Sequence, residues 1–462
     1  MPSVVKKTLG GLASLKLTVA LFAMGIFIVL AGTVAQIDKG IWTVVHEYFR
    51  CYIARIDLKI FFPRAWDVPG YFYFPGGWLI GAALMINIVS AHAARFKPNA
   101  RGPRLGLGLL FLAGGSLLTW LIIIGFFTKE IAATEGDAFW RVLVRLAQGG
   151  GAAVLLLIGC GLVFRKRAGI VLLHGGVILL LVHEVFTGMA ATEGQMRIEA
   201  GEYVNFTYDS RSVEFAIIDR EHPEFDDTVV VPGSILARVG SIKDKLLPFD
   251  IEVLEFMKNS SFANVAEAAH GWVNPATVGN GLVAMSVEQP EVSGVDPTQT
   301  VNVPAAYLKL TGRDGRDLGT YLAHLAIPSL PKQTISIGGK TYDLDLRFTR
   351  SYKPYSIQLL EFRHDKYIGT DTPKNFSARV RLIDKNRNVD RVVKIWMNNP
   401  LRYAGETFYQ SSFEPGENLT ILQVVRNDGW MLPYLSCMIV GTGLATHFGM
   451  NLIGFLRRRK AE

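Results

Sequence analysis

Charged residues are scarce in this sequence. They make up only 19% of the 462 residues, whereas 50% are hydrophobic and the mean hydropathy is +0.26. This composition is too apolar for an ordinary soluble protein. The formal charge of +8 comes from short basic clusters beside apolar runs, so a nucleic-acid partner is not expected. The composition therefore predicts a membrane protein.

Cysteine is also rare. The three cysteines, Cys51, Cys160 and Cys437, form no CxxC pair and no disulfide framework, so thiol reduction by this chain is not expected. Motifs of the GxSxG, HExxH, Walker-loop and dinucleotide-turn types are absent as well. The sequence therefore argues against an autonomous hydrolase or a nucleotide-driven pump, and the chain alone is not expected to be an enzyme.

Long apolar runs are what the sequence has in abundance. A bilayer core of about 30 Å requires about 20 apolar residues of helix. Six runs meet this requirement, at residues 17–37, 68–91, 105–128, 146–164, 168–191 and 429–455. The first run exceeds the roughly 7–15-residue core of a cleaved signal peptide, so we interpret it as a retained anchor. The glycines at 149–151 are expected at the entrance of the fourth helix.

Basic residues cluster at alternate ends of these runs. The clusters are Lys6, Lys7 and Lys16; Arg95, Lys97, Arg101 and Arg104; Arg165, Lys166 and Arg167; and Arg457, Arg458, Arg459 and Lys460. The positive-inside bias places all of them, and both termini, in the cytoplasm. We therefore expect a multi-pass protein of the bacterial cytoplasmic membrane, or alternatively of the thylakoid membrane.

The long segment at residues 192–428 has ordinary charge density and no membrane-spanning run. Alternating or β-branched stretches at 377–383 and 389–395, separated by a turn-like Asp384-Lys385-Asn386, predict a hairpin. The predicted fold is a polytopic α-helical membrane protein with about six transmembrane helices and one large extracytoplasmic β-rich domain. Its parts are a bundle at 1–191, the β-rich domain at 192–428, and a last helix with a basic tail at 429–462.

Three stretches of the sequence carry a family resemblance. They are LASLKL at 12–17 with AGTVAQ at 31–36, GIVLLH at 169–174 with EGQMRIEAGE at 193–202, and NPLRYAGETFYQSSF at 399–413. Together they resemble the ResB (CcsB) family of the system II route of cytochrome c biogenesis. That family has four spans, so the pair at 105–164 is additional. It either packs on a partner or widens the bundle.

The resemblance implies a function and a set of partners. It implies a membrane subunit that, with a CcsA/ResC-like partner, transports haem b across the membrane, binds it transiently, and supports its covalent attachment to apocytochrome c. Such a subunit belongs to a haem-transporting holocytochrome c synthase complex, with thiol-disulfide oxidoreductases as further partners and membrane lipid around it. The alternatives are a haem-free assembly scaffold that binds apocytochrome and, as a third class, a secondary transporter with His174 in a relay.

His174 is the first candidate for the axial ligand of the haem iron. Neutral imidazole suits haem, because one ring nitrogen binds iron while the other forms a hydrogen bond. His174 follows Arg167 by seven residues, which places it about 10 Å along the helix. Gly175 and Gly176 beside it would let a macrocycle or a neighbouring helix approach. The competing interpretation is a core histidine that is bonded to another helix.

The other histidines and the third motif are weaker candidates for haem binding. His447 in the last run is the second candidate for haem binding. The competing interpretation is that it interacts only with the polar side chains of Ser436, Thr442 and Thr446 on the same helix. His183 with Glu184 is expected as a structural pair at the outer interface, and His92 as an interfacial residue. His222, His270, His324 and His364 are expected at the solvated surface. The 399–413 motif is expected to be structural, and Arg402 is an additional candidate to pair with a haem propionate.

Overall fold

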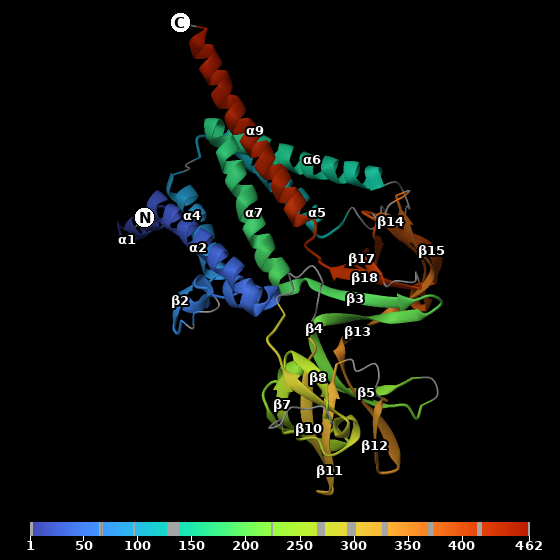
Figure 1. Ribbon diagram of the computed structural model, residues 1–462. Coiled ribbons are helices and arrows are strands. Elements are labelled where there is room, and N and C mark those ends of the chain that lie inside the picture. The colour runs from blue at the N-terminus through green and yellow to red at the C-terminus, as the bar shows by residue number, and fades with distance from the viewer. Residues whose placement is uncertain are drawn as a thin grey trace.

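The computed structural model describes residues 3–63, 66, 68–95, 98–126, 138–222, 225–265, 273–292, 302–325, 331–367, 369, 373–413 and 418–460. Helices form one part of the molecule and strands the other (Figure 1). The helices are α1 (Ser3–Leu12), α2 (Leu15–Lys39), α3 (Ile41–Val44), α4 (Gly77–Arg95), α5 (Pro103–Ile123), α6 (Ala138–Phe164), α7 (Ala168–Ala190), α8 (Gly233–Leu236) and α9 (Leu432–Arg459). The shorter turns are the π-helix η1 (Val45–Phe49) and the 3-10 turns η2 (Leu58–Phe61), η4 (Arg165–Arg167), η6 (Gly279–Leu282) and η7 (Lys385–Arg387).

Five stretches of the described chain are helical, long and apolar enough to cross a membrane. They are Leu15–Lys39, Gly77–Arg95, Pro103–Ile123, Leu143–Ala190 and Leu432–Arg459. The fourth has 48 residues and contains both α6 and α7, joined by η4. A single helix of that length would be about 72 Å long, more than twice the bilayer core. The helices therefore match the six predicted runs, and the prediction of a polytopic helical membrane protein with a β-rich part is confirmed.

Two details of the predicted helices were wrong. The second run was expected to begin at residue 68, but α4 begins at Gly77, because the aromatic residues before it form strand β2 (Tyr71–Pro75). This strand pairs antiparallel with β1 (Ile53–Asp57). The glycines at 149–151 lie well inside α6 and not at its entrance, since α6 already begins at Ala138. Residues 127 and 128 of the third run lie outside the described residues.

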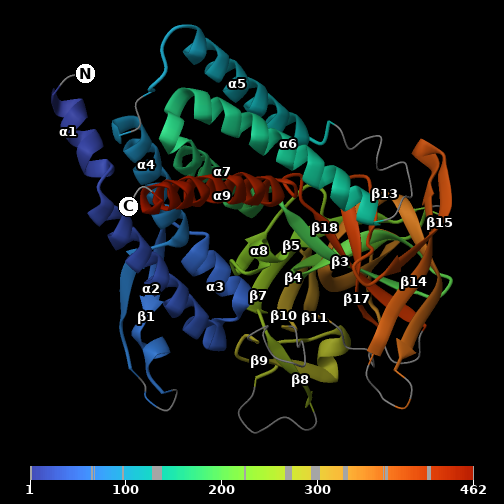
Figure 2. The ribbon, with the colours of Figure 1, turned by 90° about the horizontal axis from the view of Figure 1, so that it is seen from above.

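Glycines control the closest helix contacts of the bundle. Helices α7 and α9 cross in close contact, with α1–α4 on one side of the pair and α5–α6 on the other (Figure 2). A Cβ on Gly443 would lie 2.6 Å from Leu173 N and 2.8 Å from Gly169 O, so only glycine allows this approach. Gly149 of α6 contacts α9 in the same way, since a Cβ there would lie 2.5 Å from Met438 Sδ. Helix α6, which belongs to the pair at 105–164, therefore packs directly against α9.

We predict that Gly443→Ala destabilises the bundle. The new methyl group would overlap backbone atoms of α7, which cannot turn away, so the helices must separate, at a cost of about 1–3 kcal/mol. Gly441→Ala is the matched control on the same helix, because a Cβ there has no atom within 4 Å. Thermal unfolding of the detergent-purified protein should show a lower midpoint for Gly443→Ala alone. Equal midpoints for the two variants would contradict this account of the packing.

The basic helix ends are bonded to one another. Arg167 donates to the carbonyl oxygen of Arg95 at 2.8 Å, and Arg95 donates to that of Ala13 at 2.8 Å. Arg104 donates to the carbonyl oxygen of Leu162 at 3.0 Å. These bonds gather the start of α2, the end of α4 and the α6–α7 turn at one end of the bundle. The β-rich part lies at the opposite end, where α7 leads into β3 (Figure 1).

The β-rich part contains a sheet of ten strands and a sheet of four. The ten-stranded sheet has the order β15-β14-β13-β4-β3-β18-β17-β16, with β12 also paired to β13 and β5 to β4, and the four-stranded sheet has the order β11-β10-β7-β6. The strands are β3 (Thr192–Glu199), β4 (Tyr203–Asp219), β5 (Asp227–Pro232), β6 (Gly240–Ile242), β7 (Phe249–Met257), β8 (Ser260–Asn264), β9 (Ala284–Glu288), β10 (Ala305–Gly312), β11 (Asp317–His324), β12 (Gln333–Ile337), β13 (Lys340–Lys366), β14 (Pro373–Asp384), β15 (Val389–Trp396), β16 (Leu401–Tyr403), β17 (Glu406–Phe413) and β18 (Leu419–Arg426).

Two hydrophobic cores divide this part into two lobes. The lower lobe in Figure 1 packs around Phe215, Phe249 and Leu308, and the upper lobe packs around Met196, Ile357 and Phe408. The long strands β4 and β13 run through both lobes. The predicted hairpin is confirmed in the upper lobe, where β14 pairs antiparallel with β15.

Candidate functional site

His174 lies against a second histidine of the bundle. Its Nδ1 is 3.2 Å from Nε2 of His92, and the two rings meet edge to face with centroids 4.8 Å apart. His174 comes from α7 and His92 from α4, and both rings are half-buried. The expected interfacial position of His92 stays a prediction, and its contact with His174 was not expected. The bond from Arg167 to Arg95 holds the two helices together, so His92 faces α7.

The hydrogen bonds of this pair determine which ring nitrogens carry protons. Nδ1 of His92 is 2.8 Å from the carbonyl oxygen of Ile88, which can only accept, so this nitrogen is the donor. In the neutral ring, Nε2 of His92 then has a lone pair that accepts the Nδ1 proton of His174. Nε2 of His174 is left with its own lone pair. A histidine that ligates a metal is held in this arrangement, with the second nitrogen donating to a fixed acceptor.

The glycines beside His174 face different surroundings. A Cβ on Gly176 would lie 2.7 Å from Val440 Cγ2 and 3.0 Å from the carbonyl oxygen of Ser436, so this glycine serves the contact with α9. A Cβ on Gly175 would have no atom within 4 Å. The face of α7 at Gly175 is therefore open, whereas the face at Gly176 is closed by α9. The lone pair on His174 and this open side fit the approach of a flat macrocycle.

The structure does not bring His447 to the same place. The backbone of His447 is packed against Gly169, which precedes His174 by five residues, or about 7.5 Å along α7. Nε2 of His447 lies 3.2 Å from the side-chain amide nitrogen of Asn451, which donates to it. The lone pair on this nitrogen is thus engaged within α9. His447 as a haem ligand stays a prediction, with a less favourable setting than His174.

Three further histidines have aromatic or polar contacts of their own. His183 is bonded to the Thr187 hydroxyl, while Glu184 pairs with Arg50 at 3.9 Å instead of with His183 as expected. His222 stacks on Phe225, and His364 stacks on Phe376. His270 lies outside the described residues. In the described ranges, no group of three or more His, Cys, Asp or Glu residues could hold a metal ion.

His324 differs from the expected surface histidine. Both of its ring nitrogens are buried without a hydrogen-bond partner in the described part of the chain. Burial lowers the pKa of His324, so the neutral ring is favoured. Its ring meets Phe262 edge to face, with centroids 6.2 Å apart. The prediction of a solvated role for this residue was therefore wrong.

The 399–413 motif builds a buried polar network in the upper lobe. Glu406, only 7% exposed, accepts a bond at 2.6 Å from Lys353 and a short one from the Tyr355 hydroxyl. Burial, together with the carboxylate of Glu406, raises the pKa of Tyr355. Tyr403 donates to Asp384 at 2.6 Å, and this bond lowers the pKa of the buried Asp384 carboxyl. The network indicates a structural role for the motif.

The same motif also contacts the helical bundle. The guanidinium of Arg402 lies 4.6 Å from the centroid of the Trp430 ring, just before α9, and that of Arg145 in α6 lies 4.2 Å from it. Cations over an indole ring are attracted to its negative face. These contacts join the motif in the β-rich part to the start of α9 and to α6. Pairing of Arg402 with a haem propionate stays a prediction.

Sequence reasoning missed His92. His92 precedes Arg95 by only three residues, so it was expected near the lipid headgroups when α4 was considered alone. The pairing of Arg95 with Arg167 brings two basic helix ends together, so a histidine close to either one can face the other helix. A search for polar residues near both basic ends could have found the pair.

Comparisons with known proteins concern one part of the chain. The model of the ResB-like family matches residues 318–436, which run from β11 to the first turns of α9 and include the 399–413 motif. Protein NrfI of Wolinella succinogenes is 31% identical over 121 residues, which are 26% of this chain and 13% of NrfI. The chain thus matches a small fraction of that relative's length. The family model matches the third motif, and the other two motifs lie outside the residues that it matches.

Proposed function

We propose that this chain acts in cytochrome c biogenesis as a membrane subunit that handles haem. With a CcsA/ResC-like partner, it would transport haem b across the membrane and support its covalent attachment to apocytochrome c. The ResB-like region and the membrane-spanning helices support this role. Because the chain has no CxxC pair, reduction of the client's cysteines would fall to separate thiol-disulfide oxidoreductases.

The His92–His174 pair is the observation that carries this proposal. His92 holds the His174 ring in one tautomer and one orientation, with the Nε2 lone pair available to the iron of the haem cargo. Small residues around the pair leave space on the side of Gly175. Two hydrogen-bonded imidazoles inside a bundle are costly unless they serve a purpose, and intramembrane ionisable residues are usually functional.

The sidedness of the chain is part of the same proposal. The bonded basic helix ends would face the cytoplasm, and the β-rich part would lie outside it, in contact with apocytochrome c. His174 would then hold haem in the cytoplasmic half of the bilayer. We place the chain in the bacterial cytoplasmic membrane, with a thylakoid membrane as the alternative and lipid around the helices.

Haem content tests the proposal directly. The chain is co-expressed with a CcsA/ResC-like protein, purified in detergent, and examined by its reduced visible spectrum and by extraction of haem. We expect stoichiometric haem b with a low-spin spectrum. An assembled complex without haem would reject the haem-handling role and favour the alternative, a haem-free scaffold that binds apocytochrome through its β-rich part.

We predict that His92 acts as a positioning residue for His174. Loss of a hydrogen-bond partner behind a metal-ligating histidine typically weakens metal binding about 10–100-fold. His92→Ala should therefore weaken haem binding by that amount, with the low-spin spectrum retained when haem is in excess. His92→Gln should recover part of the affinity, since its side-chain oxygen accepts a hydrogen bond. A His92→Ala protein that holds haem as tightly as the wild type would remove His92 from the site.

A further inference from the structure

Part of strand β13 has an open edge. On one side, β13 pairs with β4 from Tyr342 to Tyr352. On the other side, β12 covers residues 340–344 and β14 covers residues 356–366. Between them, residues 345–352 have no partner strand on this side in the described part of the chain. With respect to the described strands, this open edge is about 26 Å long and has backbone donors and acceptors that no other strand pairs.

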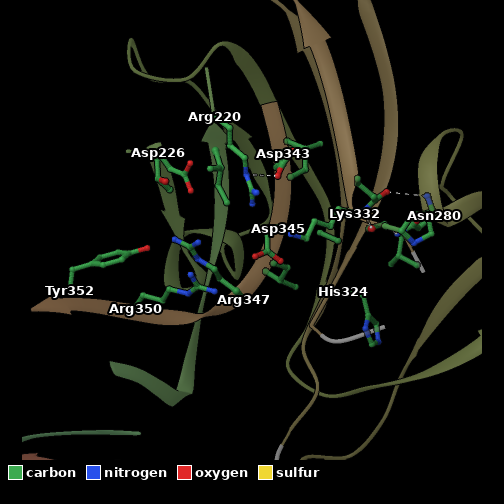
Figure 3. A pocket seen from close by; sticks show the side chains of 18 of the residues that line it. Arg220, Asp226, Asn280, His324, Lys332, Asp343, Asp345, Arg347, Arg350 and Tyr352 are labelled. Atoms are coloured by element: carbon green, nitrogen blue, oxygen red, sulfur yellow. Dashed lines mark hydrogen bonds and ion pairs between the residues drawn. The ribbon is translucent and has the colours of Figure 1, made fainter. Parts of the chain in front are cut away.

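A cavity of about 950 Å³ lies beside the open edge. It extends from the β4–β5 side across β13 to the end of β11 and the start of β12. Its polar groups include Arg347, Arg350 and Tyr352 at one end and Lys332 and His324 at the other (Figure 3). The volume lies in the range of ordinary ligand sites. A groove beside an open strand edge suits an extended chain better than a compact molecule.

Arg347 supplies a buried donor that lacks a partner. The residue is 7% exposed, and its Nε donates to Glu214 at 2.9 Å, but its NH2 group is buried without a hydrogen bond in the described residues. A buried guanidinium donor left unsatisfied costs free energy, which a ligand acceptor would recover. Arg347 lines the cavity, and Figure 3 shows it at the same end as Arg350 and Tyr352.

Arg350 adds a second positive charge at the same end. Its guanidinium lies 4.3 Å from the centroid of the Phe206 ring and forms no ion pair with a described residue. Arg220, by contrast, is paired with Asp343 at 2.8 Å. The carboxylate of Asp345 lies farther towards Lys332 (Figure 3). Asp226 lines the same end (Figure 3), so the unsatisfied donor of Arg347, and not a net positive charge, favours an acidic ligand group there.

We infer that the open edge of β13 binds an extended segment of a partner polypeptide, which adds as a strand and places an acidic side chain against Arg347 and Arg350. Strand addition gives affinity through backbone hydrogen bonds, while side-chain pockets give specificity. The inference rests on the proposed function in one respect, since it takes the partner to be a client that arrives unfolded. It does not depend on haem.

Peptide binding to the detergent-purified full chain tests this inference. The probe is a fluorescein-labelled ten-residue peptide of alternating Thr and Val with one central Glu. Two matched peptides carry Gln in place of Glu, or N-methyl groups on alternate backbone nitrogens. Fluorescence anisotropy gives their dissociation constants with the wild type, Arg350→Gln and Arg381→Gln. Arg381 is the control, because this exposed sheet arginine pairs with Asp390 on β14–β15.

We expect the Glu peptide to bind about tenfold more tightly than the Gln peptide, and N-methylation to abolish binding. Arg350→Gln should remove the preference for Glu, whereas Arg381→Gln should keep it. Hydrogen exchange of residues 345–352 should slow when the peptide binds. Equal binding of the N-methylated peptide, or no saturable binding of any peptide, would overturn the inference. Haem content of the same preparations reports on the proposed function separately.

Discussion

His174→Ala should yield a protein that is purified without haem. The imidazole of His174 supplies the lone pair at Nε2, whereas Nε2 of His447 already accepts a hydrogen bond from Asn451. Loss of an axial ligand should therefore weaken haem binding by more than 100-fold, beyond the effect expected for its hydrogen-bond partner His92. The reduced visible spectrum of the detergent-purified complex measures this directly.

Two controls separate ligation from folding. His183→Ala changes a histidine on the same helix, nine residues further, whose ring is bonded to Thr187, and should leave the spectrum unchanged. Added imidazole should restore a low-spin spectrum to His174→Ala, because it can occupy the space of the lost ring. An unchanged spectrum in His174→Ala would transfer the axial role to His447 or to the partner protein.

Glu406→Ala should destabilise the upper lobe by about 3–5 kcal/mol. The substitution leaves the ammonium group of Lys353, whose side chain is only 12% exposed, without its counter-charge. It also removes the acceptor of the Tyr355 hydroxyl. Removal of one partner from a buried pair costs far more than loss of a surface pair, because the remaining charge stays in apolar surroundings. Denaturant unfolding followed by near-UV circular dichroism would measure the change in the free energy of unfolding.

Asp390→Asn is the matched control for this prediction. Its partner Arg381 is 41% exposed, and two bonds of 2.7 Å join the pair on the surface of the same sheet. Loss of this pair should cost about 0.2–1 kcal/mol. The double variant Lys353→Met with Glu406→Leu should recover much of the stability, since no buried charge is left. Equal losses for Glu406→Ala and Asp390→Asn would show that the buried network does not stabilise the lobe.

Several local features were predictable because they depend on short stretches of sequence. An apolar run long enough to span a bilayer can satisfy its backbone only as a helix, and α2, α5, α7 and α9 follow their runs closely. The β14–β15 hairpin follows from alternation around a turn, where Asp384 accepts bonds from the backbone of η7. The start of the second run was predicted wrongly, because an apolar aromatic stretch suits a strand as well as a helix. Residues Tyr71–Pro75 form a strand because they pair with β1.

The sequence by itself determined the class of this protein and its helices, and it supplied His174 as the first candidate for a haem ligand. These follow from composition, run length and the chemistry of imidazole. Tertiary structure alone decided that His92 is the partner of His174, that Glu406 is buried with Lys353 and Tyr355, and that β13 is left open between β12 and β14. Each of these joins residues far apart in the chain, and their contact is set by helix packing and strand register, which no local pattern specifies.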